Sequence, residues 1–360
     1  MTVFFILLGL ILLTVVYAVV VAFAPWITAP PITLASDNTA EPEDDPQEKQ
    51  AVSGIPSCRH DVIIPCGGDH IHAWLYLPEA GEAPAPCVIM GNGFAGTKDM
   101  GLEQYALRFV REGFAVLAFD YRFLGASEGQ PRQLIWIPYQ KDDWRAVIAW
   151  ARARPDIDAD RVALWGTSAS GAYAVDIAAE DTKVAAVIAQ VTSLDGRVAG
   201  EIMLRKVGIG SLLRLMVHGQ RDMFRRFLRR PPHRVPVTGP AGSLAMFPLD
   251  DAYAFYSRMA APSFRNEVCA RIVLRGDKYR PIKRADRVRC SVLWQMCEHD
   301  EINPPAATAA AEKALAGRIL VRRYPAGHFG IYSGEHFARA VEEQAAFLTT
   351  QLWDVPATPT

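Results

Sequence analysis

A strand, a tight turn and a helix follow one another between residues 161 and 178, and no other segment constrains the fold as strongly. Arg161 to Trp165 predicts an apolar strand, and the apolar spacing of residues 172–178 predicts a helix. The turn between them, Gly166-Thr167-Ser168-Ala169-Ser170-Gly171, consists of small residues around a serine. A turn this sharp leaves little room beside its central residue, and it presents a serine at the carboxyl end of a parallel strand.

The turn departs in one place from the usual G-x-S-x-G pattern of such a nucleophile, because Ser170 replaces the last glycine. A serine before a helix is also explained by capping alone, since Ser and Thr are preferred at that position. The chemical interpretation of Ser168 therefore depends on partners elsewhere in the chain.

Strands and helices alternate along most of the chain. We expect a hairpin at 62–65 and 71–77, strands at 87–90, 115–119, 184–190, 291–296 and 318–322, and helices at 102–112, 139–153, 305–315 and 334–352. This alternation predicts an α/β fold with a mostly parallel, doubly wound sheet. Ligands bind at the carboxyl ends of the strands in such sheets, so polar residues that directly follow a strand are the candidates for chemistry.

Three polar residues meet that condition: Ser168, Asp300 and His328. Asp300 follows the 291–296 strand, and His328 follows the last strand in a turn flanked by Gly327 and Gly330. Histidine takes the proton of a weakly nucleophilic serine, and a carboxylate fixes the imidazole tautomer and stabilises the imidazolium. Ser, Asp and His thus form a predicted catalytic triad, in the chain order typical of one large hydrolase fold.

Each triad partner has a rival. Asp195 also follows a strand, and Asp300 is compatible with a plain turn, which Asp favours. His299 and His336 are the rival histidines, but neither directly follows a strand in a glycine-flanked turn. Two backbone N–H groups are expected to form an oxyanion hole, and we assign them to Ala169 and to Phe94, which lies in the glycine-rich loop after the 87–90 strand.

On these residues the chain resembles the α/β-hydrolase superfamily of serine hydrolases over about residues 60–352. The resemblance is strongest in the segments 93–99, 119–129 and 165–171, and the branch is similar to bacterial Xaa-Pro dipeptidyl-peptidase-like and dienelactone-hydrolase-like hydrolases. It places the nucleophile, acid and base of the family on Ser168, Asp300 and His328.

Relatives in this branch often carry a second serine where Ser170 stands. Two departures concern the pocket. Asn92 replaces a histidine found before the oxyanion glycine in many relatives, and Ala169 and Ala172 stand where relatives often have a larger residue and a glycine. We expect the run 120–122 to order the rim of the site, and Asp142-Asp143 to supply negative charge at a helix start.

The first 36 residues carry no charged side chain, and Val3 to Ala24 is almost wholly apolar. A bilayer-spanning helix needs about 20 such residues, and Trp26 follows the run, where interfacial aromatics occur. The rival interpretation is a signal peptide cleaved after Ala22-Phe23-Ala24. The run is long for a signal peptide, Pro25 would follow the cut, and no basic segment precedes it. We therefore predict an uncleaved single-pass anchor at residues 1–28.

Residues 29–58 are predicted to be an acidic disordered tether, because acids and prolines concentrate between 35 and 50. The hydrolase domain is expected at 59–352 and a short tail at 353–360. Neither flank of the apolar run holds a Lys/Arg cluster that fixes its orientation. The acidic flank favours export of the catalytic domain.

The α/β alternation breaks between Gln190 and Ser291, and we expect a helical cap insertion at about 196–270. Residues 196–234 contain ten Lys or Arg against two acidic residues, interspersed with Leu, Met and Phe. Such a segment is expected to cover the active site and shape its pocket. Two interpretations of its charge stay open: contact with an anionic membrane surface, and a solvated helical face.

Composition argues against several other classes of binding partner. The formal net charge of −1 argues against nucleic acid. The six cysteines show no zinc-type spacing, so neither a metal nor a cofactor is expected, although Cys58 and Cys66 are close enough in sequence to pair in an oxidising compartment. The oligomeric state is left open.

The predicted function is cleavage of a small-molecule carboxylic ester through an acyl-enzyme. Two alternatives remain. A peptidase or amidase of dipeptidyl-peptidase type needs a carboxylate to capture the substrate amine, and the cap is basic. A non-catalytic, membrane-tethered binding protein on a hydrolase fold is the other, because fold does not imply function.

Overall fold

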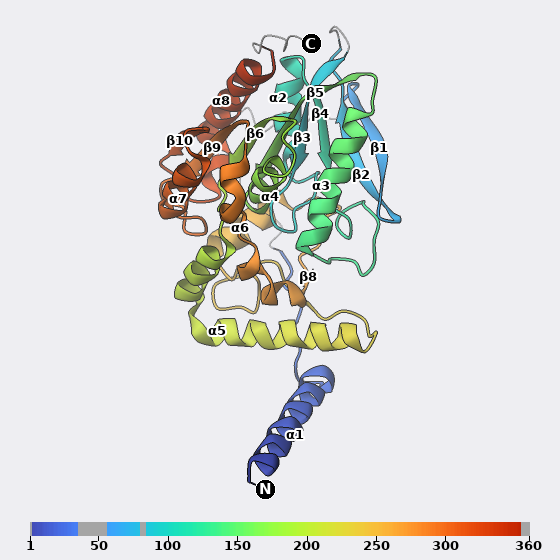
Figure 1. Cartoon of the computed structure of the whole chain (residues 1–360), viewed down its shortest axis with the longest axis vertical. Coiled ribbons are helices and arrows are strands. Elements are labelled where there is room, and N and C mark those ends of the chain that lie inside the picture. Colours follow the sequence, from blue (N-terminus) through green and yellow to red (C-terminus); the bar gives the residue numbers. More distant parts are fainter. Residues whose placement is uncertain (1, 35–55, 80–83, 354–360) are drawn as a thin grey trace.

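The computed structural model describes residues 2–34, 56–79 and 84–353. Its main feature is an eight-stranded sheet in the order β1-β2-β4-β3-β5-β6-β9-β10 (Figure 1). The strands are β1 (Arg59–Cys66), β2 (Asp69–Tyr76), β3 (Ala85–Gly91), β4 (Ala115–Phe119), β5 (Ile157–Thr167), β6 (Val184–Gln190), β9 (Ser291–Cys297) and β10 (Ile319–Tyr324). β1 and β2 are antiparallel, and β3 to β10 of this sheet run parallel. The predicted α/β class is confirmed.

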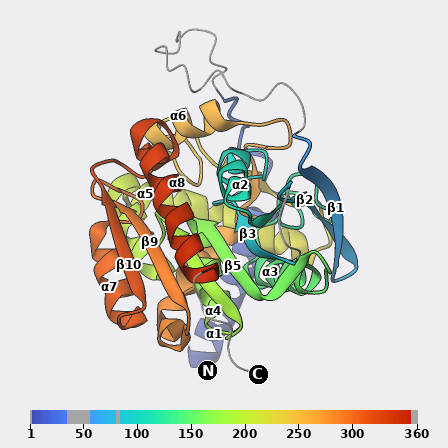
Figure 2. The ribbon, with the colours of Figure 1, turned by 90° about the horizontal axis from the view of Figure 1, so that it is seen from above.

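Helices cover both faces of the sheet (Figure 2). α2 (Leu102–Arg111) and α8 (Gly334–Leu352) pack on one face, and α3 (Ile137–Arg152) and α4 (Ala169–Ala178) pack on the other. α7 (Pro305–Leu315) joins β9 to β10. Successive strand residues point to opposite faces, so Trp165 of β5 packs under α2 and α8, whereas Leu164 packs under α3 and α4. Because both faces are buried, the parallel strands are almost continuously apolar.

The cap leaves the sheet after β6 and returns at β9, as the break in the sequence pattern predicts. It begins with α5 (Gly196–Phe227), which bends at Gly208. The rest comprises β7 (Arg234–Val235), α6 (Asp250–Met259), β8 (Val268–Cys269) and the short 3₁₀ helices η1 (Ala270–Leu274), η2 (Gly276–Lys278) and η3 (Pro281–Arg287). The cap lies over the carboxyl ends of the parallel strands, since residues of α6 line one pocket with Ser168 at the end of β5. Catalytic groups are expected at these ends.

The N-terminal helix α1 (Thr2–Phe23) projects from the body, and only its C-terminal end meets the cap (Figure 1). Its segment Phe5–Phe23 is long and apolar enough to cross a bilayer. Val21 and Ala22 are buried, and the Arg221 guanidinium of α5 donates a hydrogen bond of 2.8 Å to the Val21 carbonyl.

The first residues of the predicted tether lie against the cap. Asn266 donates from Nδ2 to the Ile32 carbonyl at 3.0 Å, and the Tyr253 hydroxyl donates to the Thr33 carbonyl at 2.9 Å. Residues 29–34 are thus part of the folded body and not free chain. Residues 35–55, and the predicted tail beyond Trp353, lie outside the described residues.

The possible Cys58–Cys66 disulfide is wrong. All six cysteines are free thiols. Cys58 and Cys66 lie at opposite ends of the β1 segment, roughly 26 Å apart at the usual rise of an extended strand. A disulfide requires Cα atoms within about 7 Å, so closeness in sequence here means separation in space.

Candidate active site

Ser168 lies at the junction of β5 and α4 with φ 50° and ψ −119°, a conformation that residues with a side chain rarely adopt. Two residues at and just after the end of β6 hold it there. The Ser168 N–H donates to the Gln190 carbonyl at 2.8 Å, and the Thr192 hydroxyl donates to the Ser168 carbonyl at 2.6 Å. A strained residue fixed by its surroundings is typical of a functional position.

The small residues of the turn allow the strand and the helix to touch. A Cβ added at Gly166 would lie 2.2 Å from the Ser170 carbonyl oxygen, and one added at Gly171 would lie 2.8 Å from Cβ of Thr192. Neither position has room for a side chain. The sharp turn predicted from the sequence therefore requires glycine at both positions.

Asp300 and His328 meet at the carboxyl ends of β9 and β10. His328 donates from Nδ1 to Oδ2 of Asp300 at 2.7 Å, and both side chains are buried. Oδ1 of Asp300 accepts from the backbone N–H groups of Ile302 and Asn303 at 2.8 and 2.7 Å. With both carboxylate oxygens engaged, the imidazole is held in one orientation and its Nε2 is left for another partner.

The rival acid Asp195 has a different role. It accepts the Arg197 N–H at the start of α5, and its carboxylate receives two bonds from the Arg280 guanidinium at 2.8 and 2.7 Å. The rival base His336 lies beside the ring of Tyr324. His299 shares a loop with Asp300, but the histidine that is hydrogen-bonded to the Asp300 carboxylate, at 2.7 Å, is His328.

Ser168 and His328 line one pocket, which encloses about 610 Å³ of empty space, including its opening to solvent. Its walls are aromatic and apolar, and among the described residues none of its lining side chains is Asp, Glu, Lys or Arg. The remaining lining residues are Asn92, Gly93, Phe94, Gly96, Met100, Gly101, Leu102, Gln104, Tyr105, Trp165, Thr167, Phe255, Tyr256, Met259, Phe329, Tyr332 and Phe337. Within the described ranges no cluster of three His, Cys, Asp or Glu side chains that could hold a metal occurs.

The glycine-rich loop after β3 approaches Ser168 closely. A Cβ added at Gly93 would lie 3.4 Å from Cβ of Ser168. Asn92 closes the loop: its Oδ1 accepts the Gly93 N–H at 2.8 Å, and its Nδ2 donates to the Thr97 carbonyl at 2.7 Å. Phe94 lines the pocket beside Ser168. The assignment of the Phe94 and Ala169 N–H groups as oxyanion donors stays a prediction.

Solved structures with this arrangement of elements include the α/β hydrolase GrgF from Penicillium sp. sh18. It matches with a TM-score of 0.70 at 22% identity, over 82% of this chain and 99% of that one. The hypothetical protein PA2218 from Pseudomonas aeruginosa matches with a TM-score of 0.71 at 20% identity, over 89% of this chain and 100% of that one. Both matches show the fold.

Sequence comparison goes further. The X-Pro dipeptidyl-peptidase (S15 family) profile matches residues 67–210. The quorum-quenching protein AidA of Acinetobacter baumannii (strain MDR-ZJ06) is 36% identical over 301 residues, which cover 83% of this chain and 97% of the relative. This chain belongs to the α/β-hydrolase superfamily. The hydrolase falls in the branch that resembles X-Pro dipeptidyl-peptidases, as its motifs predict. It is also 27% identical over 290 residues to the thiohydrolase aneE of Aspergillus aculeatus, over 76% of this chain and 87% of that one.

Ser170 of the hydrolase has a structural role that its sequence position conceals. Trp144 donates from Nε1 to the Tyr121 hydroxyl at 2.9 Å, Tyr121 and Ser170 share a hydrogen bond of 2.5 Å, and Ser170 donates to the Asn92 carbonyl. The Ser170 hydroxyl has one proton and donates it to the Asn92 carbonyl, so the Tyr121 hydroxyl is the donor in its hydrogen bond with Ser170. This buried relay ties the serine turn to the glycine-rich loop.

The run 120–122 orders the rim of the site, as expected. Asp120 is fully buried, and its carboxylate accepts from the Lys98 ammonium and the Lys98 N–H, both at 2.7 Å, and from the Ala126 N–H at 2.9 Å. A buried carboxylate is stable only with such partners. Asp120 therefore fixes the loop that follows the glycine-rich segment. It is not among the residues that line the pocket.

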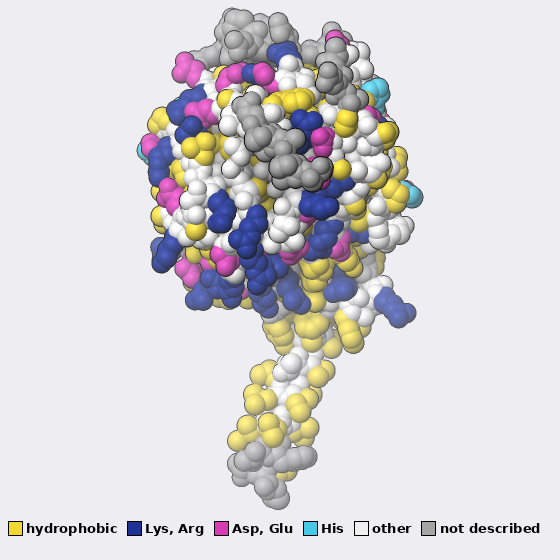
Figure 3. Space-filling model, turned by 45° about the horizontal axis from the view of Figure 1, so that its top comes forward, with side chains coloured by type: hydrophobic (Ala, Val, Ile, Leu, Met, Phe, Trp, Pro, Cys, Tyr) yellow, Lys and Arg dark blue, Asp and Glu magenta, His cyan; other side chains and the backbone are white. Residues whose placement is uncertain are grey.

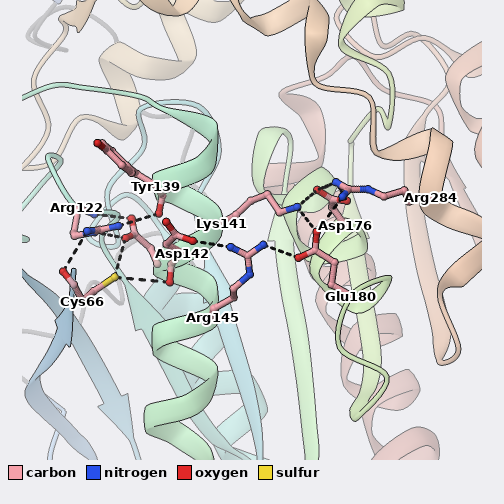
Figure 4. A network of polar contacts seen from close by, with 10 residues as sticks. Cys66, Arg122, Tyr139, Lys141, Asp142, Arg145, Asp176, Glu180 and Arg284 are labelled. Carbon is pink, nitrogen blue, oxygen red and sulfur yellow. Dashed lines mark hydrogen bonds and ion pairs between the residues drawn. The ribbon is translucent and has the colours of Figure 1, made fainter.

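The interpretation of Asp142-Asp143 as charge at a helix start is wrong for Asp143. α3 begins at Ile137, so Asp143 lies in its second turn, where it is fully buried against Arg122 at 2.5 Å. Figure 4 shows the ion pairs that continue from this pair: Lys141 and Arg284 contact Asp176 of α4. Arg145 contacts Glu180, which follows the end of that helix. The network ties α3 and η3 to α4, the helix that follows Ser168.

Sequence reasoning missed the contribution of α6. Phe255, Tyr256 and Met259 form one wall of the pocket, and the Tyr256 hydroxyl donates to the Phe94 carbonyl at 2.7 Å. The only sequence signal was a run of aromatic residues at 253–256 within the expected cap. Nothing in the sequence states which loop that run contacts.

Proposed function

We propose that the hydrolase is a membrane-anchored serine esterase that cleaves an uncharged carboxylic ester through an acyl-enzyme. The observation that carries the proposal is the convergence of Ser168, at a strained turn, with the Asp300-paired imidazole of His328 in one pocket. The names of relatives, among them a thiohydrolase, agree with chemistry at an acyl carbonyl.

In this mechanism Nε2 of His328 removes the proton of Ser168 as its Oγ attacks the ester carbonyl carbon. Asp300 stabilises the imidazolium, and the N–H groups of Phe94 and Ala169 stabilise the oxyanion. Collapse of the tetrahedral intermediate releases the alcohol, which takes the proton from His328. Water then attacks the acyl-enzyme with His328 as base, which releases the carboxylic acid and frees Ser168.

An ester is favoured over a peptide by the lining of the pocket. A dipeptidyl-peptidase captures the substrate amine, and a cationic amine needs an anionic partner. The described lining of the pocket holds no carboxylate, whereas its aromatic walls suit an uncharged acyl group. The S15-family match supports the peptidase alternative at the level of sequence. The 2.7 Å contact between Asp300 and His328 speaks against a purely binding protein.

The test combines a fluorophosphonate probe with paired substrates. Wild type and the control Ser211→Ala, a serine of α5 outside the pocket, are expected to be labelled, and Ser168→Ala is not. Hydrolysis of p-nitrophenyl acyl esters is expected to fall on the order of 10⁴-fold or more in Ser168→Ala. Equal labelling of all three proteins would remove Ser168 as nucleophile. Release of p-nitroaniline from aminoacyl-proline substrates, without ester cleavage, would favour the peptidase.

We also propose that α1 is a retained anchor with the catalytic domain on the extracytoplasmic side. Ala22 and Ala24, which mark the potential cleavage site, are buried, and the chain after them packs on the cap through Ile32 and Thr33. Resistance to alkaline carbonate extraction and an intact N-terminal peptide by mass spectrometry are expected. Digestion of the domain by protease added outside sealed cells tests its side.

A further inference from the structure

A second pocket lies at the C-terminal end of α5 and shares no lining residue with the Ser168 pocket. We call it the arginine pocket. It encloses about 1120 Å³ of empty space, including its mouth, and its walls combine arginines with aromatic rings. Its lining residues are Gln130, Pro131, Leu134, Trp136, Tyr139, Arg226, Arg229, Arg230, Pro231, Pro232 and Arg271.

Three of these arginines have no ion-pair partner in the described part of the chain. Arg271 is neutralised by Asp222, which accepts its guanidinium at 2.6 and 2.9 Å. Arg226, Arg229 and Arg230 are exposed and form no ion pair with any described residue, and no carboxylate lines the pocket. The Arg226 guanidinium lies 5.7 Å from the centre of the Trp136 ring, which pre-orients it. Three guanidinium groups that line one pocket, with no carboxylate of the described chain beside them, favour an anion, and phosphate above all.

The backbone holds these arginines at a conformational cost. α5 ends with hydrogen bonds from the Arg229 N–H to the Arg226 carbonyl and from the Arg230 N–H to the Arg225 carbonyl. This is a Schellman end, and Arg229, with φ 53°, stands where glycine is usual. A left-handed arginine costs about 1 kcal/mol or more relative to glycine. The chain keeps an arginine there although glycine would stabilise the turn.

The arginine pocket lies where α1 meets the cap. The Arg230 guanidinium is 5.5 Å from the ring of Phe23, the last residue of α1. α5 lies across that end of α1, and Figure 3 shows Lys and Arg side chains gathered around the hydrophobic collar at the base of α1. If α1 spans the hydrocarbon core, the pocket is at the depth of the lipid headgroups.

The outer face of α5 is apolar on the same side. Ile209, Leu213 and Phe227 are 61%, 53% and 85% exposed, and their spacing of four and fourteen residues places them on one helical face. Gln220 belongs to that face and is hydrogen-bonded to Tyr17 of α1. The face of α5 that contacts α1 therefore continues on both sides of α1 as exposed apolar surface beside arginines. This pattern is typical of a helix that lies in a membrane interface.

We propose that α5 lies in the headgroup layer and that the arginine pocket binds the phosphate of an anionic phospholipid. The lipid phosphate bridges Arg226, Arg229 and Arg230, its headgroup packs against Trp136 and Tyr139, and its acyl chains lie beside Phe227 and α1. The proposal rests on α1 being the retained anchor. It fixes the height of the Ser168 pocket above the bilayer, because cap and sheet form one body.

The test uses the full-length protein in detergent, so it reads headgroup binding whether or not α1 spans a membrane. Binding of dihexanoyl phosphatidylglycerol and dihexanoyl phosphatidylcholine is measured by native mass spectrometry. The test variant is Arg226→Gln/Arg229→Gln/Arg230→Gln. The matched control is Arg111→Gln/Lys183→Gln/Arg289→Gln, which removes three exposed charges at the opposite end of the sheet. A third variant keeps the charge by changing the three pocket arginines to lysine.

We expect wild type and the control to prefer the anionic lipid, and the pocket variant to lose about 100-fold in affinity for it, since each basic residue near an anionic surface contributes about a five-fold factor. The lysine variant is expected to retain most binding. Equal affinity for both lipids, equal loss in the control, or inorganic phosphate competing at the affinity of the lipid would each overturn the proposal. Unchanged thermal unfolding of the variants excludes misfolding as the cause.

Discussion

Ser170 and Asp143 illustrate what a residue's position in the sequence conveys. Ser170 departs from the G-x-S-x-G pattern, and in the fold it donates to the Asn92 carbonyl while it accepts from Tyr121. Asp143 has the position of a surface helix charge, and in the fold it is the buried partner of Arg122. Both roles depend on residues at least 21 positions away, so no local pattern predicts them.

Restoring the motif glycine at Ser170 is expected to harm the enzyme. Ser170→Gly leaves the Asn92 carbonyl and the Tyr121 hydroxyl without their partner, which costs about 1–3 kcal/mol of folding free energy. It also loosens the loop that carries Phe94, and we expect kcat for esters to fall about ten-fold. Urea unfolding and ester kinetics measure the two effects.

Tyr121→Phe serves as the control for the relay, because it removes the same hydrogen bond without changing the serine turn. It is expected to reproduce part of both losses. A Ser170→Gly enzyme as active and stable as wild type would show that the relay does not position the loop.

At the scale of elements, strands and helices of the α/β part were predictable because their apolar periodicity follows from burial on one or two faces. The segment 184–190, for example, is predicted and observed as β6 with the same bounds. The sequence predicted that the cap is an insertion, but it did not predict how the elements of the cap pack. α6 is held at the pocket by a hydrogen bond from the Tyr256 hydroxyl to the Phe94 carbonyl. The two residues are 162 positions apart in the sequence.

The α6 wall of the pocket is expected to set the acyl length. Met259 lines the pocket and lies against Gly101, where an added Cβ would be 2.6 Å from the Met259 methyl group. Met259→Ala removes three heavy atoms from this wall. We expect the best p-nitrophenyl ester to become longer by about two carbons, because an unfilled pocket favours the larger acyl group.

Arg258→Ala, a change to the exposed neighbour on α6, is the control and is expected to leave the ranking of esters unchanged. The same ranking in Met259→Ala and wild type would place the acyl group elsewhere in the pocket.

A histidine pair makes the cap sensitive to acid. Nδ1 of His218 on α5 and Nε2 of His233 lie 2.7 Å apart with their rings stacked. Burial, with His218 and Arg221 nearby, lowers the pKa of His233 to about 4 from 6.5. Between these values the unfolded chain binds a proton that the folded one does not. The free energy of unfolding is therefore highest above pH 6.5 and falls towards pH 4, by about 1–2 kcal/mol after solvent screening.

Thermal unfolding of wild type and His233→Gln at pH 7.5 and pH 4.5 measures this effect. The stability difference between the two proteins is expected to shrink or reverse at the lower pH. A difference that does not change with pH would mean that the His218–His233 pair does not titrate in this window.

At the scale of the whole molecule, the cap separates the sheet from α1, and residues 29–34 pack on that cap. A shortened protein that begins at Ala29 is expected to keep the thermal stability of the domain. One that begins at Pro56 loses the contacts of Ile32, Thr33 and Leu34, and its Tm is expected to fall by about 3–8 °C. Differential scanning fluorimetry in mild detergent compares the two.

Tyr253→Phe in the protein that begins at Ala29 removes only the bond to the Thr33 carbonyl, and it is expected to account for part of the loss. Equal Tm values for both shortened proteins would mean that the 29–34 segment adds nothing to folding.

Local patterns were enough to predict the α/β class, the polar residues that follow the strands and the apolar N-terminal helix, because burial leaves a periodic pattern of apolar residues in the sequence. The sequence also selected Ser168, Asp300 and His328, since carboxyl ends of parallel strands meet at one edge. The packing of the cap, the acid that contacts His328 and the place of the arginines at the C-terminal end of α5 beside α1 became known from the three-dimensional structure alone. These features depend on contacts between residues far apart in the chain, and no local sequence pattern predicts such contacts.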